Sequence, residues 1–220
     1  MKHLFQLILL CTITTFISCN DDDIKFNYGN FRMDFVTVLS SETGIKFLRD
    51  DGMTLFSATN SANSEYLNPG NRIILRYIPG EKISPTEQSA DIQSISVVPQ
   101  GDIRLSMKEQ AESFGNDPLY IISLWPGGGY LNLRYKIELN NAHHQLVMFY
   151  IPENQISQDT LYLELRHKAN SNNPGYLSKG YASFALEKIH NSIQKVKAIK
   201  VNTNIYNLKQ QYFIFNTETL

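Results

Sequence analysis

Three things are scarce in this sequence: an excess of charge of one sign, cysteine, and long apolar runs. The 20 Lys and Arg residues nearly balance the 21 Asp and Glu residues, and the formal net charge is -1. Such a chain has no positive field to attract a nucleic acid, and we expect no nucleic-acid partner. The longest apolar stretch, residues 4–18, is shorter than the about 20 residues of a membrane-spanning helix. The sequence therefore predicts no permanent transmembrane helix.

The first residues have the layout of a secretory signal peptide. Lys2 and His3 precede the apolar stretch, and a polar run beginning at Asn20 follows it. Of the two cysteines, Cys11 lies inside the stretch and would be removed with it, which leaves Cys19 as the only thiol. The mature chain then forms no internal disulfide. The alternative is a buried N-terminal helix of a cytosolic protein.

The end of the apolar stretch resembles a lipobox, the site where bacterial lipoproteins are linked to diacylglycerol and cleaved before the cysteine. Residues 16–19 read Phe-Ile-Ser-Cys, and Phe16 replaces the usual Leu with another apolar residue. We predict a lipoprotein signal peptide over residues 1–18, lipidation of Cys19, and an acidic tether over residues 19–30. Buried acyl methylenes contribute about 0.8 kcal/mol each, so several acyl chains give a stable membrane anchor.

An acidic run follows the predicted lipidation site. Asp21, Asp22 and Asp23 resemble the export signal of Bacteroidetes lipoproteins, which sends them to the outer face of the outer membrane. Three carboxylates also keep this stretch solvated and accessible to a sorting receptor. We therefore expect a lipid-anchored outer-membrane protein exposed at the cell surface. The alternative is a solubilising tether on a protein that faces the periplasm.

Most of the remaining sequence alternates with period two, which is typical of half-buried strands. Phe31, Met33 and Phe35 alternate with polar residues, and the apolar residues between 131 and 139 do the same. One short helix is predicted over residues 108–114, because Ser106 and Glu109 fit a capping box.

The turn-forming residues 115–118, Gly-Asn-Asp-Pro, then break the chain. We place the domain boundary there, between β blocks at residues 31–115 and 116–220. Many short strands without long helices predict an all-β protein built as a sandwich or barrel.

Four stretches, taken in order along the chain, resemble the NigD-like family of Bacteroidetes lipoproteins. They are residues 19–23 (CNDDD), 48–52 (LRDDG), 115–118 with 125–132 (GNDP, WPGGGYLN), and 163–167 (LELRH). The resemblance implies an N-terminal OB-type barrel, a short connecting helix and a C-terminal β-sandwich. It implies no activity, because the family takes its name from a bacteriocin gene cluster and its molecular role is not established.

Residues 125–132 form the most distinctive segment. Its three consecutive glycines could let a sugar or peptide backbone approach closely, with Trp125 and Tyr130 as stacking faces. The alternative is a bulge or tight corner that packs Trp125 into the core. A phosphate site is excluded because no Lys-Ser/Thr pair and no helix follow the glycines.

The other chemically capable residues favour structural roles. His143 and His144 point to opposite faces of a strand and cannot easily share a metal ion, and His167 lies in register with apolar positions at a strand end. Glu138 and Glu164 form no convincing acid pair for glycoside hydrolysis. The mature chain has neither a nucleophile elbow nor a catalytic cysteine. We therefore predict no catalytic site, metal or cofactor.

These observations favour a non-enzymatic, lipid-anchored surface protein whose β domains bind a protein or glycan partner. The alternatives are a bacteriocin-associated protective protein, which rests on the family name alone, a glycan-active enzyme, and a purely structural envelope protein. A concave face with exposed aromatic residues would favour a glycan ligand. Two carboxylates converging in a cleft would favour the enzyme, and a flat apolar patch would favour a protein partner.

Overall fold

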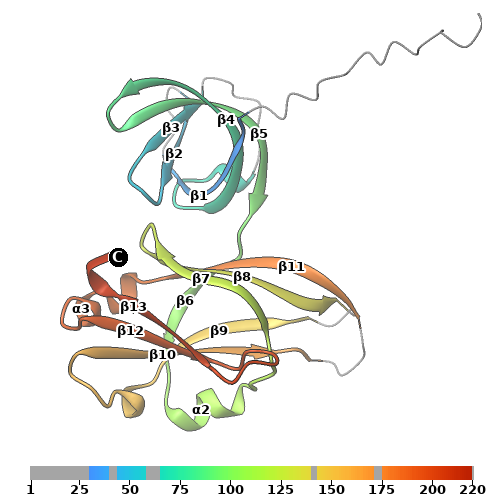
Figure 1. The fold of residues 1–220 in the computed structure, drawn as a ribbon, viewed down its shortest axis with the longest axis vertical. Helices are drawn as coiled ribbons and strands as arrows, with labels where there is room; N and C mark the ends of the chain where they lie inside the picture. Colours follow the sequence, from blue (N-terminus) through green and yellow to red (C-terminus); the bar gives the residue numbers. More distant parts are fainter. Residues whose placement is uncertain (1–29, 40–43, 58–64, 140–142, 171–174, 220) are drawn as a thin grey trace, which may run out of the picture.

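The computed structural model describes residues 30–39, 44–57, 65–139, 143–170 and 175–219. They form an all-β molecule in which a barrel is seated on a larger sandwich (Figure 1). The predicted signal peptide, Cys19 and residues 21–23 lie outside the described residues. Among the helices that are described, none is long and apolar enough to cross a membrane.

The N-terminal domain is a closed five-stranded barrel with strand order β1-β2-β3-β5-β4. This is the OB-type architecture that the family resemblance implied. Its core contains Val36, Phe47, Leu55 and Tyr77, none of which exposes any surface. The strands are β1 (Arg32–Val38), β2 (Ile45–Arg49), β3 (Thr54–Ser57), β4 (Arg72–Ser84) and β5 (Glu87–Val97), with the 3₁₀ turn η2 (Glu65–Leu67) before β4.

The C-terminal domain is a single eight-stranded sheet, folded into a sandwich, with the order β13-β12-β10-β9-β6-β11-β8-β7. Its strands are β6 (Gln100–Leu105), β7 (Tyr120–Gly127), β8 (Tyr130–Leu139), β9 (Gln145–Tyr150), β10 (Thr160–Lys168), β11 (Tyr176–Ala185), β12 (Ala198–Thr203) and β13 (Tyr212–Asn216). The alternation predicted for residues 131–139 is confirmed in part, since Leu131, Leu133 and Tyr135 are buried in the core. Short helical segments occupy the connections: α2 (Lys108–Ser113), η3 (Pro152–Asn154), η4 (Glu187–Ile189), α3 (His190–Ile193) and η5 (Thr217–Thr219).

Strand β6 joins the two halves of the sandwich. Its first residues pair in parallel with β11, and its last residues pair in parallel with β9. Ile103 at its centre is 2% exposed and lies in the sandwich core. The chain therefore passes from barrel to sandwich between Val97 and Gln100, whereas the sequence pattern placed the boundary near residue 115. The break at residues 115–118 is a turn inside the second domain.

Helix α2 is the short helix that the sequence predicts, but the capping box does not form. Met107 occupies the N-cap position and makes no side-chain capping bond. The Ser106 hydroxyl instead donates to the carbonyl oxygen of Met107. Ala111 is fully buried, and together with Phe114 it packs against Phe149 of β9. The helix therefore covers part of the sheet, since its apolar face needs a partner to be stable in water.

Candidate functional site

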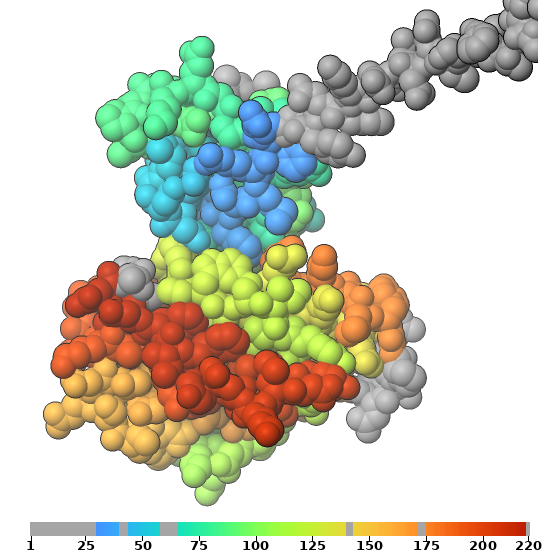
Figure 2. Space-filling model, in the orientation of Figure 1, coloured from blue at the N-terminus to red at the C-terminus, as the bar shows by residue number. Residues whose placement is uncertain are grey.

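The main polar cluster of the molecule lies where the barrel meets the sandwich. In Figure 2 the segments of β1 to β3, blue to cyan, rest directly on the yellow-green segments of β7 and β8. Arg72, the first residue of β4, enters this junction, and its side chain has no solvent exposure. One of its terminal nitrogens lies 2.5 and 2.7 Å from the two carboxylate oxygens of Asp50. A buried guanidinium must be paired, because leaving it unpaired would cost several kcal/mol.

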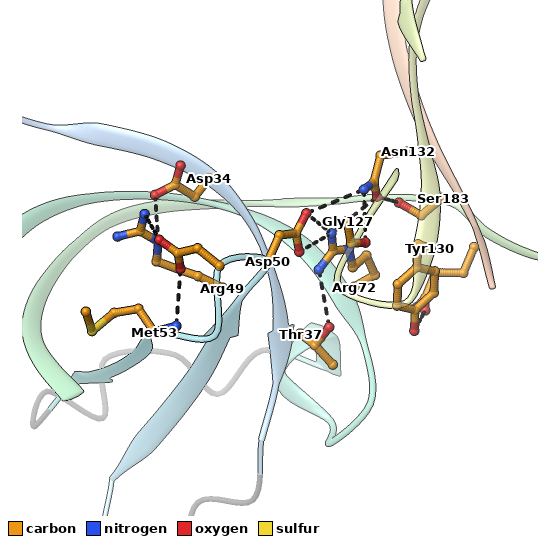
Figure 3. A network of polar contacts seen from close by, with 12 residues as sticks. Asp34, Thr37, Arg49, Asp50, Met53, Arg72, Gly127, Tyr130, Asn132 and Ser183 are labelled. Atoms are coloured by element: carbon orange, nitrogen blue, oxygen red, sulfur yellow. Dashed lines mark hydrogen bonds and ion pairs between the residues drawn. The ribbon is translucent and has the colours of Figure 1, made fainter. Parts of the chain in front are cut away.

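The sandwich supplies further partners of this ion pair, besides a hydrogen bond from Arg72 to the Thr37 hydroxyl of the barrel at 3.3 Å (Figure 3). The Asn132 side-chain oxygen accepts from Arg72 at 3.2 Å and from the Ser183 hydroxyl at 2.8 Å. Its amide nitrogen donates to the carbonyl of Gly127 at 3.2 Å and to Asp50 at 3.4 Å. Asn132 and Ser183 are opposite each other on β8 and β11, and both are fully buried. A continuous hydrogen-bond network therefore connects the two domains.

The hairpin between β2 and β3 sets the electrostatics of the junction. Burial raises the pKa of Asp50 above its ordinary value of 3.8, and the hydrogen bond and charge of Arg72 lower it less than burial raises it. Gly52 completes the turn with φ of +83°, a conformation that favours glycine. Residues 48–52, one of the stretches that carry the family resemblance, thus supply the turn of this hairpin, and Asp50 is the partner of Arg72 in the ion pair.

Aromatic rings lie beside the Arg72 guanidinium, and one of them belongs to Tyr130, a predicted ligand-binding residue. The Tyr130 ring centre lies 5.0 Å from the guanidinium carbon, and the Phe35 ring centre lies 5.5 Å from it. Trp125 meets Phe35 edge-on, with ring centres 5.2 Å apart. Trp125 and Tyr130 therefore contact the barrel, and Trp125 is partly buried against the other domain rather than packed into the core of its own.

The glycines of this corner allow the close approach. A Cβ atom on Gly127 would lie 2.6 Å from a carboxylate oxygen of Asp50. Gly128 has φ of +60°, and a Cβ there would lie 2.9 Å from a nitrogen of Arg72. Gly129 has φ of +81° but no heavy atom within 4 Å of its Cβ position. The glycines thus admit the side chains of Asp50 and Arg72 rather than an external ligand.

Substitution of Gly128 should therefore cost more than the same substitution one residue later. Gly129→Ala should lower the free energy of unfolding by about 1 kcal/mol, because alanine disfavours positive φ. Gly128→Ala adds overpacking against Asp50 and Arg72, for a total of about 3 kcal/mol. Urea denaturation of both variants measures the difference. Equal losses of unfolding free energy in the two variants would show that Gly128 is not in close contact with the ion pair.

The histidines pack as a pair. The rings of His144 and His167 are stacked at 5.2 Å between centres, and Nδ1 of His144 lies 2.9 Å from Nε2 of His167. Burial lowers the pKa of His167 below 6.5, the charge of His144 lowers it further, and a hydrogen bond to the Pro118 carbonyl opposes both. His143 is exposed. Within the described ranges, no three His, Cys, Asp or Glu side chains gather in a way that could hold a metal ion.

The two glutamates weighed as an acid pair lie on different strands. Glu164 of β10 accepts hydrogen bonds from Arg166 and Asn154. Glu138 of β8 is exposed. Four strand steps separate β8 from β10 in the sheet order. The geometry therefore gives no support for a pair of carboxylates flanking one glycosidic bond.

The stretches that carry the family resemblance and lie within the described residues meet in space in two places. Residues 48–52 and 125–132 form the junction described above. In the second place, the amide of Asp117 donates to the carbonyl of His167 at 2.9 Å, and its carboxylate accepts from the amide of Ala169 at 2.8 Å. Both places are structural, because they fasten the barrel to the sandwich and the residue 115–118 turn to β10.

Fold and junction together define a class of two-domain β proteins, in which a five-stranded barrel is locked onto an eight-stranded sandwich. The model of the NigD-like C-terminal beta sandwich domain matches residues 103–217, more than half of the chain. The chain therefore belongs to the NigD-like family, as the resemblance indicated.

Solved structures share this fold at low sequence identity. A protein of unknown function from Bacteroides vulgatus is 23% identical, with a TM-score of 0.74, over 84% of this chain and 90% of its own. A NigD-like immunity protein from Bacteroides caccae is 23% identical, with a TM-score of 0.61, over 86% and 93%. A candidate lipoprotein from Bacteroides fragilis is 12% identical, with a TM-score of 0.62, over 84% and 96%. The sequence matches none of the curated proteins with which it was compared.

Proposed function

We propose that the protein is a lipid-anchored, surface-exposed binding protein without catalytic activity, whose barrel and sandwich act as one rigid body. The junction carries this proposal. Arg72 has no exposed side-chain surface and shares its partners between the two domains. Such a network fixes the orientation of the domains, so that a ligand meets a single preformed surface.

The chemistry of the junction also argues against catalysis there. Asn132 and Ser183 are completely buried, and Ser183 donates to Asn132 rather than to a histidine base. A nucleophilic serine needs a neighbouring base and access to substrate. These buried polar groups thus serve to join the two domains.

The location rests on the sequence, with support from a similar structure. Cys19 ends the apolar stretch and is the only thiol after residue 11. The candidate lipoprotein from Bacteroides fragilis has the same fold. A thioether-linked lipid explains both the position and the isolation of this cysteine. The carboxylates of residues 21–23 then lie next to the anchor, where a sorting receptor could bind them.

Two variants separate anchoring from export. Cys19→Ala should move the protein out of the membrane fraction, whereas Cys11→Ala, the matched control inside the signal peptide, should leave it there. Replacement of Asp21, Asp22 and Asp23 by alanine should keep the protein in the membrane but protect it from protease added to intact cells. The measurements are cell fractionation and immunoblotting. Protease protection of the unchanged protein in intact cells would refute surface exposure, and membrane association of Cys19→Ala would refute the anchor.

A protective role is the second candidate function. It is favoured by the common fold with the NigD-like immunity protein from Bacteroides caccae, which covers 86% of this chain. In that case the rigid surface would bind a toxin outside the cell. Survival of toxin-challenged cells with and without the gene would distinguish protection from other binding roles.

A further inference from the structure

A polar trough on the outer face of the sandwich lies away from the junction. It has a volume of about 440 Å³ and is lined by side chains of β10, β12 and β13 and of the adjoining loops. Glu164, Asn202 and Tyr212 stand side by side across three strands, since Glu164 pairs with Asn202 and Asn202 with Tyr212. Two strand spacings of about 4.8 Å make this row about 10 Å long.

The two ends of the row are held in fixed positions. The Glu164 carboxylate accepts from Asn154 at 2.6 Å and from two nitrogens of Arg166 at 3.0 and 2.8 Å. The ammonium group of Lys200 lies 4.1 Å from the ring centre of Tyr212. Lys200 is not among the residues that line the trough, so it holds the ring from outside. Preorganised groups of this kind bind a ligand with little loss of conformational entropy.

Asn202, at the centre of the row, has hydrogen-bonding groups that are available to a ligand. The side-chain amide of Asn202 is partly exposed and forms no hydrogen bond with another described residue. A carboxamide offers two N–H donors and a carbonyl acceptor. It lies between a carboxylate, which accepts hydrogen bonds, and a tyrosine ring, whose face packs against C–H groups. Asn116 adds a further carboxamide to the lining, whereas the carboxamide of Gln211 is bonded to the backbone of Ile205 and Leu208.

We propose that this trough binds a neutral, hydroxyl-rich oligosaccharide. Adjacent sugar hydroxyls both donate and accept, as the carboxamides and the Glu164–Arg166 pair do, and the sugar ring presents C–H groups to an aromatic face. Leu165 is the sole apolar aliphatic residue of the lining, so the trough offers no side-chain pockets for an apolar peptide. The opposite charges of Glu164 and Arg166 disfavour a strongly charged ligand. The lining contains a single carboxylate, so the site binds a glycan without the second acid needed to cleave it.

This assignment rests on the proposed function, because such a ligand is met outside the cell. The test uses the full chain and six linear hexasaccharides as probes, built from β1,4-glucose, α1,4-glucose, β1,3-glucose, β1,4-xylose, β1,4-mannose and β1,4-N-acetylglucosamine. We expect at least one to bind by isothermal titration calorimetry and to be recovered intact. Asn202→Ala and Tyr212→Ala should each weaken binding at least tenfold, which is about 1.4 kcal/mol.

The matched control is Tyr176→Ala, which removes a 69% exposed tyrosine from β11, outside the trough. It should bind like the unchanged protein. Asn202→Asp, which keeps the shape of the side chain, tests the site if Asn202→Ala unfolds. Failure of every probe to bind, or unchanged binding by the folded Asn202 and Tyr212 variants, would overturn the glycan site. Cell fractionation would still report on the membrane anchor, so the two proposals fail separately.

Discussion

Replacing Arg72 with alanine should lower the free energy of unfolding by about 3 kcal/mol. Removing one partner of a buried ion pair costs about 3–5 kcal/mol, because the other charge remains in a site that excludes water. We expect the lower end of this range, since Asp50 keeps 24% of its side-chain exposure and can be partly hydrated. The substitution also removes the ring contacts with Phe35 and Tyr130. Urea denaturation gives the loss directly.

The pH dependence of this loss gives an independent check. Burial already raises the pKa of Asp50, and without Arg72 nothing of comparable strength opposes it. A carboxyl group with a raised pKa binds its proton more tightly in the folded state than in the unfolded state. Its contribution is therefore present below the unfolded pKa of about 3.9 and is lost as pH rises through the folded pKa. The Arg72→Ala variant should accordingly lose less stability at pH 4 than at pH 7.

Arg76→Ala is the matched control for this experiment. Arg76 lies on the same strand, is exposed, and also stacks on a ring, that of Phe31, at 4.0 Å. Its loss should cost less than about 1 kcal/mol, as is usual for surface contacts. A comparable cost for Arg72→Ala and Arg76→Ala would mean that the junction contributes little to stability. The rigid-body element of the proposed function would then lack its basis.

The sequence predicts the strands of this protein better than it predicts the junction. Alternation is visible in both β1 and β8. In β8 the expected face is buried, since Leu131 and Leu133 are in the core. In β1 the expected face is wrong, because Met33 is 56% exposed and the core residues are Val36 and Val38.

The same pattern wrongly predicts that the side chains of Arg72 and Asn132 face solvent. Both sit among apolar strand residues and read as solvent-facing positions, yet both are buried. These two outward-facing polar residues are buried because the other domain covers them, and period-two patterns carry no information about that covering domain.

Two features of the junction were nevertheless visible in the sequence. Aspartates next to Gly52 and three consecutive glycines after Trp125 each require an explanation from backbone geometry. Neither stretch alone shows that the two meet. The Asp50 carboxylate occupies the space beside Gly127 and Gly128, where a side chain would otherwise lie. The trough is hidden for a similar reason. Glu164, Asn202 and Tyr212 come from three strands, two of them paired in parallel, and only the register brings them together.

The domain boundary is where local and non-local information conflict most. Residues 115–118 look like a linker because a glycine, two polar residues and a proline end a helix. Strand β6 lies before them, at residues 100–105, but its hydrogen-bond partners are β9 and β11, which come much later in the chain. Strand pairing between residues so far apart in the chain cannot be recognised from a short stretch of sequence. The sheet topology therefore predicts a folding unit that includes β6, whereas the local composition predicts one that begins at residue 116.

A fragment of residues 98–220 should fold, and a fragment of residues 116–220 should not. The longer fragment keeps β6 between β9 and β11, whereas the shorter one opens the sheet at its centre and removes Ile103 from the core. Loss of one large buried aliphatic side chain costs about 2–5 kcal/mol, and the unpaired strand edges add to this. That sum approaches the about 5–15 kcal/mol stability of a whole domain. We expect cooperative thermal unfolding, followed by circular dichroism, for the longer fragment only.

A point substitution in the intact chain tests the same strand without truncation. Ile103→Asn places a polar group in the core and should destabilise the sandwich by several kcal/mol, because a buried amide without partners pays its full desolvation cost. Arg104→Asn, at the neighbouring exposed position, should change the stability by less than about 1 kcal/mol. Cooperative unfolding of the 116–220 fragment, together with tolerance of Ile103→Asn, would mean that β6 is dispensable. The sandwich would then begin at residue 116, as the turn at residues 115–118 suggests when the sequence is read alone.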